Sequence, residues 1–307
     1  MRCFNQALLA SFVSVVPSFS YGQGGPTELI ASAKSVPSIV KESRATLSTT
    51  KPHSGTVLLC GGGPIPHQIR ENFHDRGKGD KGSLVVIPTA SSIADLGDYT
   101  YWIDFWGAFR WGSLDIVHLQ DRDAAMADEK AVRKLESATA VWIGGGDQSR
   151  LAERYLGTPI EAAIHSVLGR GGIVGGTSAG AAIASSLMIS GGWNDPKLAS
   201  GFPLLPKAIV DQHFTQKRRF ERLARAVYSN PERTGIGVDE STGVFISREK
   251  AKVVGDGAVY VYRATSNPPS EPQADSHDPI NTFLSIETAR LLPGDEIDAR
   301  DLDVFGH

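Results

Sequence analysis

The chain has 307 residues, of which 41% are hydrophobic and 21% charged, and a formal net charge of −3. These are ordinary values for a globular protein, and the length is sufficient for one large α/β domain or two smaller ones. The near-neutral charge gives no electrostatic footprint for nucleic acid, so we expect no nucleic-acid partner.

The first 22 residues predict a secretory signal peptide. Arg2 is their one charged residue, an apolar stretch runs from Ala7 to Phe19, and small residues lie around Ser18–Gly22. The stretch is short and contains Pro17, which disfavours a membrane span, with an uncleaved anchor as the alternative. We therefore expect export to the periplasm or the extracellular space, without stable membrane association after cleavage.

Residues 23–54 are rich in Ser, Thr, Pro and Lys, and this composition predicts an N-terminal extension of the mature chain. Residues 55–307 are expected to form a single α/β domain. Once the signal is removed, Cys60 would be the one remaining cysteine, so no intramolecular disulfide is expected.

Five apolar segments have the continuous hydrophobic pattern of buried parallel strands. Between them lie helix-like stretches, among them Asp123–Ala138 and Ser149–Arg170. Buried strands that alternate with helices predict a mainly parallel central sheet with helices on both faces. The five segments are Thr56–Pro64, Ser83–Ser92, Leu114–Leu119, Thr139–Gln148 and Gly171–Gly180.

The pattern changes after the fifth segment. Lys207–Phe214 and Gly235–Ser241 predict further strands. Val244–Arg263 predicts a β-hairpin, with Gly255–Gly257 as its turn or a bulge. The polar, proline-rich segment Ala264–Asn281 is expected to be a surface loop.

Three glycine-rich strand ends should converge on the carboxyl edge of the sheet, where ligands bind in such folds: Gly61–Gly63, Gly144–Gly146 and Gly175–Gly176. None is followed by the Lys-Ser/Thr of a P-loop, and the dinucleotide fingerprint is not matched either. The glycines therefore predict no nucleotide cofactor.

Ser178 is the first candidate for chemistry. Gly176–Gly180 matches the pattern G-x-S-x-G, preceded by a predicted strand and followed by a helix-forming run. In that setting a sharp turn presents the serine, and amides at the start of the helix can stabilise an oxyanion. The alternative is an ordinary serine at a helix N-cap.

A catalytic serine needs a base, and His213 is the candidate because it lies near the end of a predicted strand. Asp239 and Glu240 end the next strand and could orient it, but strand parity alone does not choose between them. Asp211 and His213 could also form a metal pair, but no further ligand cluster supports it, so no metal is expected.

Four motifs, "GGGDQ", "GGTSAGAAI", "DQHF" and "GIGVDE", occur in this order between Thr56 and Tyr262. Together they resemble the cyanophycinases of peptidase family S51. The resemblance implies a flavodoxin-like three-layer α/β sandwich related to class I glutamine amidotransferases, with a C-terminal β-hairpin region in this chain. It also implies serine-type hydrolysis without a cofactor.

The resemblance assigns roles to residues of this chain. It makes Ser178 the nucleophile, His213 the base and Glu240 the acid, which selects Glu240 over Asp239. We expect the N–H groups of Gly146 and Ala179 to bind the oxyanion. Lys217 stands where the family has the first of a series of arginines, and a lysine cannot bind a carboxylate through the same two-point fork. The substrate-binding residues implied by the family are Gln148, Asp211, Gln212, Arg219 and Arg222.

Cyanophycin has a polyaspartate backbone with arginines on its side-chain carboxyl groups, and the family releases β-Asp-Arg dipeptides from it. The resemblance therefore implies a peptide or cyanophycin substrate. The alternatives are an aspartyl (Asp-X) or isoaspartyl dipeptidase and a non-catalytic exported binding protein on the same fold. A homodimer is left open.

Overall fold

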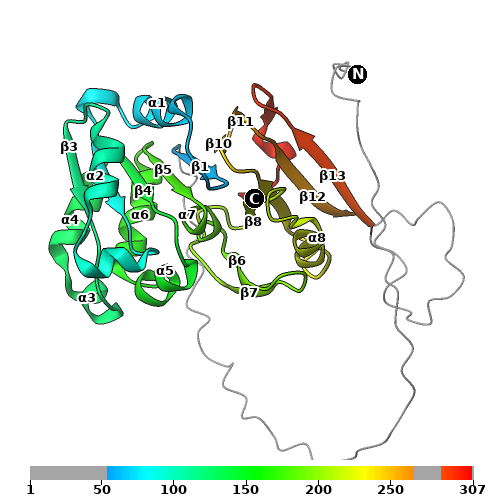
Figure 1. Ribbon diagram of the computed structural model, residues 1–307, viewed down its shortest axis with the longest axis horizontal. Coiled ribbons are helices and arrows are strands. Elements are labelled where there is room, and N and C mark those ends of the chain that lie inside the picture. The colour runs from blue at the N-terminus through cyan, green and yellow to red at the C-terminus, as the bar shows by residue number, and fades with distance from the viewer. Residues whose placement is uncertain (1–53, 266–284, 306–307) are drawn as a thin grey trace, which may run out of the picture.

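The computed structural model describes residues 54–265 and 285–305 (Figure 1). The predicted signal peptide, nearly all of the predicted extension and most of the predicted proline-rich loop lie outside the described residues. Within the described ranges, no helix has both the length and the apolar character needed to cross a membrane.

The central sheet is mixed, with a parallel part and an antiparallel part. In the described residues its order is β14-β11-β10-β1-β5-β4-β2-β3. The pairs from β1 to β3 are parallel, whereas β10, β11 and β14 extend the sheet with antiparallel pairs. The strands are β1 (Thr56–Cys60), β2 (Ser83–Ile87), β3 (Ser113–Ile116), β4 (Ala140–Ile143), β5 (Ile173–Thr177), β10 (Thr242–Ile246), β11 (Lys250–Gly255) and β14 (Glu296–Asp298).

Helices cover both faces of this sheet. Alternate residues of β1 divide between two cores, with Val57 and Leu59 on one side and Leu58 and Cys60 on the other. On the second side lie α1 (His67–Arg76) and α2 (Thr100–Gly107), with the short 3₁₀ helices η2 (Gly79–Lys81) and η3 (Ser92–Leu96) in the adjoining loops. The first side is covered by α3 (Arg122–Ala127), α4 (Glu129–Ser137), α5 (Gln148–Tyr155), α6 (Pro159–Gly169) and α7 (Ala179–Ala182). The predicted three-layer α/β fold is confirmed.

A second sheet, of order β13-β12-β9-β8, stands beside the first (Figure 1). One of its faces contributes Val210 and Val238 to the core of the central sheet. The other face packs Ile209 against Leu223 of α8. These elements are β8 (Ala208–Gln212), β9 (Thr234–Val238), β12 (Val259–Thr265), β13 (Ser285–Leu291) and α8 (Phe220–Tyr228); the hairpin β6 (Leu187–Gly191)–β7 (Lys197–Ser200) precedes them, and η4 (Ala299–Asp301) follows β14.

The predicted hairpin over Val244–Arg263 is wrong in its turn and its partners. The hairpin is β10–β11, and its turn is formed by Ser247, whose backbone N–H and hydroxyl both donate to the Lys250 carbonyl. Gly255–Gly257 instead carries the chain from the central sheet to β12 in the second sheet. Gly255 has a φ of 122° there, which an L-residue with a side chain rarely adopts.

Two predicted helices are each divided in two. Asp128 ends α3 and caps α4, because its carboxylate accepts the N–H of Ala131. In the second stretch α5 ends at Tyr155, Gly157 follows with a φ of 71°, and Pro159 begins α6.

Candidate active site

Ser178 lies at a sharp turn between β5 and α7. Its φ of 52° and ψ of −112° are strained for a residue with a side chain. The neighbouring glycines leave no room for a side chain, since a Cβ on Gly176 would lie 2.2 Å from the carbonyl oxygen of Gly180. The same addition on Gly180 would lie 2.2 Å from the carbonyl oxygen of Ile143. The sequence therefore builds an elbow that lifts the serine out of the sheet.

The Ser178 side chain does not cap the helix. The residue occupies the N-cap position of α7, but the capping acceptor is its carbonyl oxygen, which binds the N–H groups of Ala181 and Ala182 at 3.0 Å. Its Oγ lies 2.9 Å from Nε2 of His213. The hydroxyl is thus directed at a histidine rather than at the helix, which favours a chemical role over the capping alternative.

His213 and Glu240 reach Ser178 from the second sheet. His213 follows β8, Glu240 follows β9, and the two strands are parallel neighbours. Nδ1 of His213 lies 2.5 Å from Oε1 of Glu240. The structure therefore brings together the predicted nucleophile, base and acid as one chain of hydrogen bonds across two sheets.

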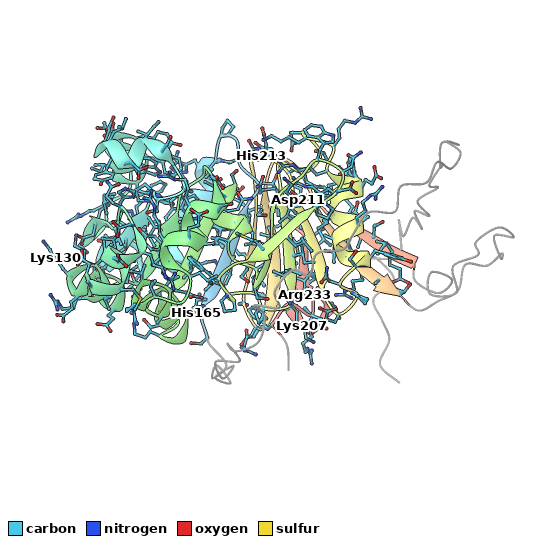
Figure 2. All side chains as sticks on the ribbon, turned by 90° about the horizontal axis from the view of Figure 1, so that it is seen from below. Lys130, His165, Lys207, Asp211, His213 and Arg233 are labelled. Atoms are coloured by element: carbon cyan, nitrogen blue, oxygen red, sulfur yellow. The ribbon has the colours of Figure 1, made fainter. Side chains whose placement is uncertain are left out.

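The two ends of this second sheet differ in what they carry. Figure 2 shows Asp211 and His213 at one end, and Lys207 and Arg233 at the opposite end. Lys207 precedes β8 and pairs with Asp303, while Arg233 precedes β9 and donates to the carbonyl of Pro206. The candidate active site is therefore at the carboxyl ends of the strands, where ligands gather in such sheets.

Asp239 does not compete with Glu240 for the histidine. Its carboxylate is buried and accepts the backbone N–H groups of Thr215 and Ala258 at 2.9 and 3.0 Å. Asp239 thus ties together the loops that carry His213 and the start of β12. The structure places Glu240, as the family pattern implied, in contact with the imidazole.

The glycine loop after β1 closes over this pair. A Cβ on Gly62 would lie 2.3 Å from Cε1 of His213, and one on Gly63 would lie 2.9 Å from Oε2 of Glu240. The carbonyl oxygen of Gly61 accepts the N–H of His213 at 2.7 Å. The sequence marked these glycines as a possible ligand loop; Gly62 and Gly63 line the cavity beside Ser178 and also lie against the His213–Glu240 pair.

Burial lowers the pKa of His213 below the ordinary value for histidine. The hydrogen bond to Glu240 acts in the opposite direction, and the positive charge of Lys217 lowers the pKa further. The imidazole is therefore neutral at neutral pH, which is the form that can accept a proton.

Of the predicted substrate-binding residues, all but Gln148 form a mostly buried network of their own. Arg222 makes a two-point contact with the carboxylate of Asp211, which is 1% exposed, and also donates to the carbonyl of Gly192 at 2.7 Å. Arg219 donates through Nη1 to Asp211 at 3.3 Å and to Oε1 of Gln212 at 2.5 Å. Gln148 donates to the carbonyl of Ile189 at 2.7 Å. These groups bond to one another and to the backbone.

A cavity of about 450 Å³ opens beside Ser178 and His213. It extends away from the charged network, toward η3 and α2, and none of the five predicted substrate-binding residues lines it. Sequence reasoning missed this aromatic side; the signal was the run of aromatic residues in Tyr99–Trp106. The other lining residues are Gly62, Gly63, Ile65, Ser91, Ile93, Asp98, Tyr101, Trp102, Phe105, Trp142, Gly144, Gly145 and Thr177.

The predicted oxyanion donors are the residue after Ser178 and a residue in the loop after β4. Ala179 is the first residue of α7, so its N–H is one that the helix itself leaves unbonded. Gly146 follows Gly145, and a Cβ on Gly145 would lie 3.5 Å from Cβ of Ser178. Their role stays a prediction. Among the described residues, no group of three or more His, Cys, Asp and Glu side chains is arranged to hold a metal ion.

Comparison with known proteins links the chain to one family of peptidases. Residues 57–254 match the family described as Peptidase family S51. Over 252 residues the chain is 34% identical to a cyanophycinase of Synechococcus elongatus, covering 78% of this chain and 76% of that protein. A cyanophycinase of Trichormus variabilis is 33% identical over 252 residues, which cover 76% of this chain and 81% of that protein.

The fold is also similar to a solved structure. The crystal structure of a peptidase from an acI-B1 actinobacterium matches with a TM-score of 0.56 and 20% sequence identity. The match covers 80% of this chain and 97% of that chain. At this identity the similarity concerns the fold.

Proposed function

Since the chain belongs to peptidase family S51, we propose that it degrades cyanophycin to β-Asp-Arg dipeptides through an acyl-enzyme on Ser178. The observation that carries the proposal is the hydrogen-bonded chain from Ser178 through His213 to Glu240 at the wall of the cavity. The similarity to cyanophycinases supports the choice of substrate.

In the first half of the reaction, Nε2 of His213 takes the proton of the Ser178 hydroxyl as Oγ attacks the scissile carbonyl carbon. Glu240 fixes the tautomer of His213 and stabilises the imidazolium that forms. The amides of Ala179 and Gly146 receive the oxyanion. The imidazolium then gives its proton to the leaving amine, and the bond from the carbonyl carbon to nitrogen breaks.

In the second half, water takes the place of the amine. His213 accepts a proton from the water as it attacks the acyl-enzyme, and returns that proton to Ser178 when the ester bond breaks. No cofactor takes part. The depressed pKa of His213 keeps the base neutral under mildly acidic conditions, so turnover should persist there.

The test is a panel of purified cyanophycin, Asp-X peptides and β-Asp-X peptides. We expect release of β-Asp-Arg from cyanophycin, and a loss of at least about 10³-fold in rate for Ser178→Ala without a change in thermal midpoint. Ser137→Ala, at the end of α4, is the matched control and should leave the rate unchanged.

Each other outcome of the panel selects an alternative. Preferred turnover of Asp-X peptides would indicate an aspartyl dipeptidase. Full activity in Ser178→Ala would contradict the acyl-enzyme. Binding of cyanophycin without hydrolysis would indicate a binding protein on the same fold.

We also propose that the chain is exported, on the strength of the charge and hydropathy of its first 22 residues. In a host that secretes proteins, the mass of the protein outside the cytoplasm should correspond to a chain that begins near residue 23. Recovery of the intact chain from Met1 in the cytoplasmic fraction would contradict this proposal.

A further inference from the structure

The cavity beside Ser178 has a wall of aromatic rings that the proposed mechanism does not use. Tyr101 and Phe105 are four residues apart on α2, and their rings stack with centroids 5.9 Å apart. Phe105 in turn stacks on Trp142 of β4 at 6.4 Å. Tyr101 is 67% exposed, whereas Trp102 beside it is 6% exposed. The wall therefore presents one accessible ring, Tyr101, on a buried aromatic base.

Charge in the cavity comes from one carboxylate. Among the described residues that line it, Asp98 is the one Asp or Glu, and none is Lys or Arg. The backbone N–H of Thr100 donates to Oδ1 of Asp98 at 3.0 Å. This hydrogen bond and one from the Thr100 side chain lower the pKa of Asp98, so the carboxylate is ionised and held in place at the start of α2.

A hydroxyl group next to the serine has unused hydrogen-bonding capacity. Thr177 lines the cavity, and its buried Oγ1 finds no hydrogen-bond partner among the described residues. A buried hydroxyl without a partner is costly, so a bound ligand that reaches it gains a hydrogen bond. This observation points to a ligand independently of the aromatic wall.

The rings of this wall already pack against a guanidinium group elsewhere. Cζ of Arg70 lies 4.8 Å from the ring centroid of Phe105 and 5.5 Å from that of Phe109. Because the guanidinium group of Arg70 lies over the Phe105 ring, it would repel a second cation from that ring. The accessible position for a cation is therefore at Tyr101, beside the carboxylate of Asp98.

Asp211, the carboxylate on the charged side of Ser178, cannot take this role. Asp211 is bound by Arg222 and Arg219, and these two guanidinium groups would repel an incoming cation. A cationic side chain of a substrate held at Ser178 is thus directed to the aromatic side of the cavity.

We propose that Asp98 and Tyr101 form a subsite for a guanidinium group of the substrate, with the planar cation on the Tyr101 ring and its N–H groups on the Asp98 carboxylate. This inference rests on the proposed function, because cyanophycin presents arginine groups along its backbone. It makes Asp98 and Tyr101 the residues that set specificity for arginine.

The experiment uses two synthetic peptides that differ in one group: a β-Asp-Arg dimer, and the same peptide with citrulline in place of arginine. Citrulline keeps the shape of the side chain and lacks the charge. The protein should favour the arginine peptide in kcat/KM by roughly tenfold or more, the sum of one cation–π contact and one exposed ion pair.

Asp98→Asn should remove most of this preference by lowering kcat/KM for the arginine peptide alone. Tyr101→Ala should also lower kcat/KM for the arginine peptide and so reduce the preference. The matched control is Asp104→Asn, which removes an exposed carboxylate of the same helix that does not line the cavity, and it should keep the full preference.

Binding measured without turnover separates the two proposals. In Ser178→Ala, calorimetric titration should show the arginine peptide binding roughly tenfold more tightly than the citrulline peptide, with a clearly smaller preference, the share of the Tyr101 ring, after Asp98→Asn is added. That preference without hydrolysis by the unaltered protein would overturn the proposed function and keep the subsite. Hydrolysis of both peptides with equal kcat/KM, or an unchanged preference in Asp98→Asn, would overturn the subsite.

Discussion

The two sides of Ser178 differ in what their polar groups are bonded to. On one side Asp211, Gln212, Arg219 and Arg222 are charged or polar, mostly buried, and bonded to one another. On the other side, rings and the carboxylate of Asp98 line an open cavity. The difference shows that charged residues close together in the sequence can be bonded to one another, so such a cluster does not by itself indicate a ligand-binding surface. The charged residues are bonded to β8, which carries His213 at its end, whereas the aromatic side lines an open cavity beside Ser178.

The largest expected effect on the reaction rate comes from Glu240, which is hydrogen-bonded to His213. Glu240→Gln keeps the shape of the side chain but removes the charge that holds the His213 tautomer. We expect kcat for β-Asp-Arg release to fall by about 10³- to 10⁴-fold, with little change in thermal midpoint. Glu249→Gln, in the β10–β11 turn, is the control. Activity within a few-fold of the unaltered protein in Glu240→Gln would remove Glu240 from the reaction.

The charged side is tested by Arg222→Met. Because Asp211 is buried, the loss of its two-point partner should lower the free energy of unfolding by about 3–5 kcal/mol, measured by urea denaturation. Arg225→Met, on the exposed face of the same helix, should cost about 1 kcal/mol or less. Unchanged stability together with a raised KM would mean that Arg222 binds substrate, and the comparison between the two sides would fail.

The glycine loop that lies against the His213–Glu240 pair gives a smaller effect. Gly62→Ala places a methyl group 2.3 Å from Cε1 of His213, at a backbone φ of +101°. The imidazole must move, and we expect kcat to fall by about 10²-fold with KM for the β-Asp-Arg dimer little changed. Gly294→Ala, where a Cβ meets open space at a φ of +95° and the residue does not line the cavity, controls for the backbone conformation. Equal losses in both variants would show that backbone strain, and not the position of His213, causes the effect.

The smallest effect is a shift in pH dependence. Lys217 lowers the pKa of His213, so Lys217→Gln should raise that pKa and move the acidic limb of the kcat/KM profile to higher pH by less than about one unit. The neighbouring Arg218 is exposed and is not among the main charges that shift the pKa of His213, so Arg218→Gln should move the limb less than Lys217→Gln does. A limb that moves to lower pH in Lys217→Gln would contradict this electrostatic account.

Much of the fold follows from local pattern. The strands of the parallel part are continuous apolar runs, and the G-x-S-x-G context located the elbow at Ser178. The hairpin over Val244–Arg263 was misplaced because Gly255–Gly257 is the stronger local turn signal, while Ser247 forms the real turn with its side chain. Whether β10 and β12 belong to one sheet or two depends on contacts with β1 and β9, far away in the sequence.

The site was predictable to a similar degree. Ser178, His213 and Glu240 could be named, since each follows a strand with a recognisable motif. The bonding of Arg222 to Asp211 could not be foreseen, because the sequence of a buried ion pair resembles that of a charged binding surface. Nor could the sequence place α2 against the cavity, because that depends on which face of the sheet the helix covers.

The central claim is that Ser178 is the nucleophile. Treatment with a fluorophosphonate, followed by intact mass and peptide mapping, measures this most directly. We predict one adduct per chain, on Ser178, formed in proportion to the loss of β-Asp-Arg release and absent in His213→Ala. Complete modification of Ser178 with full remaining activity, or complete inactivation with the adduct on another residue, would contradict the account.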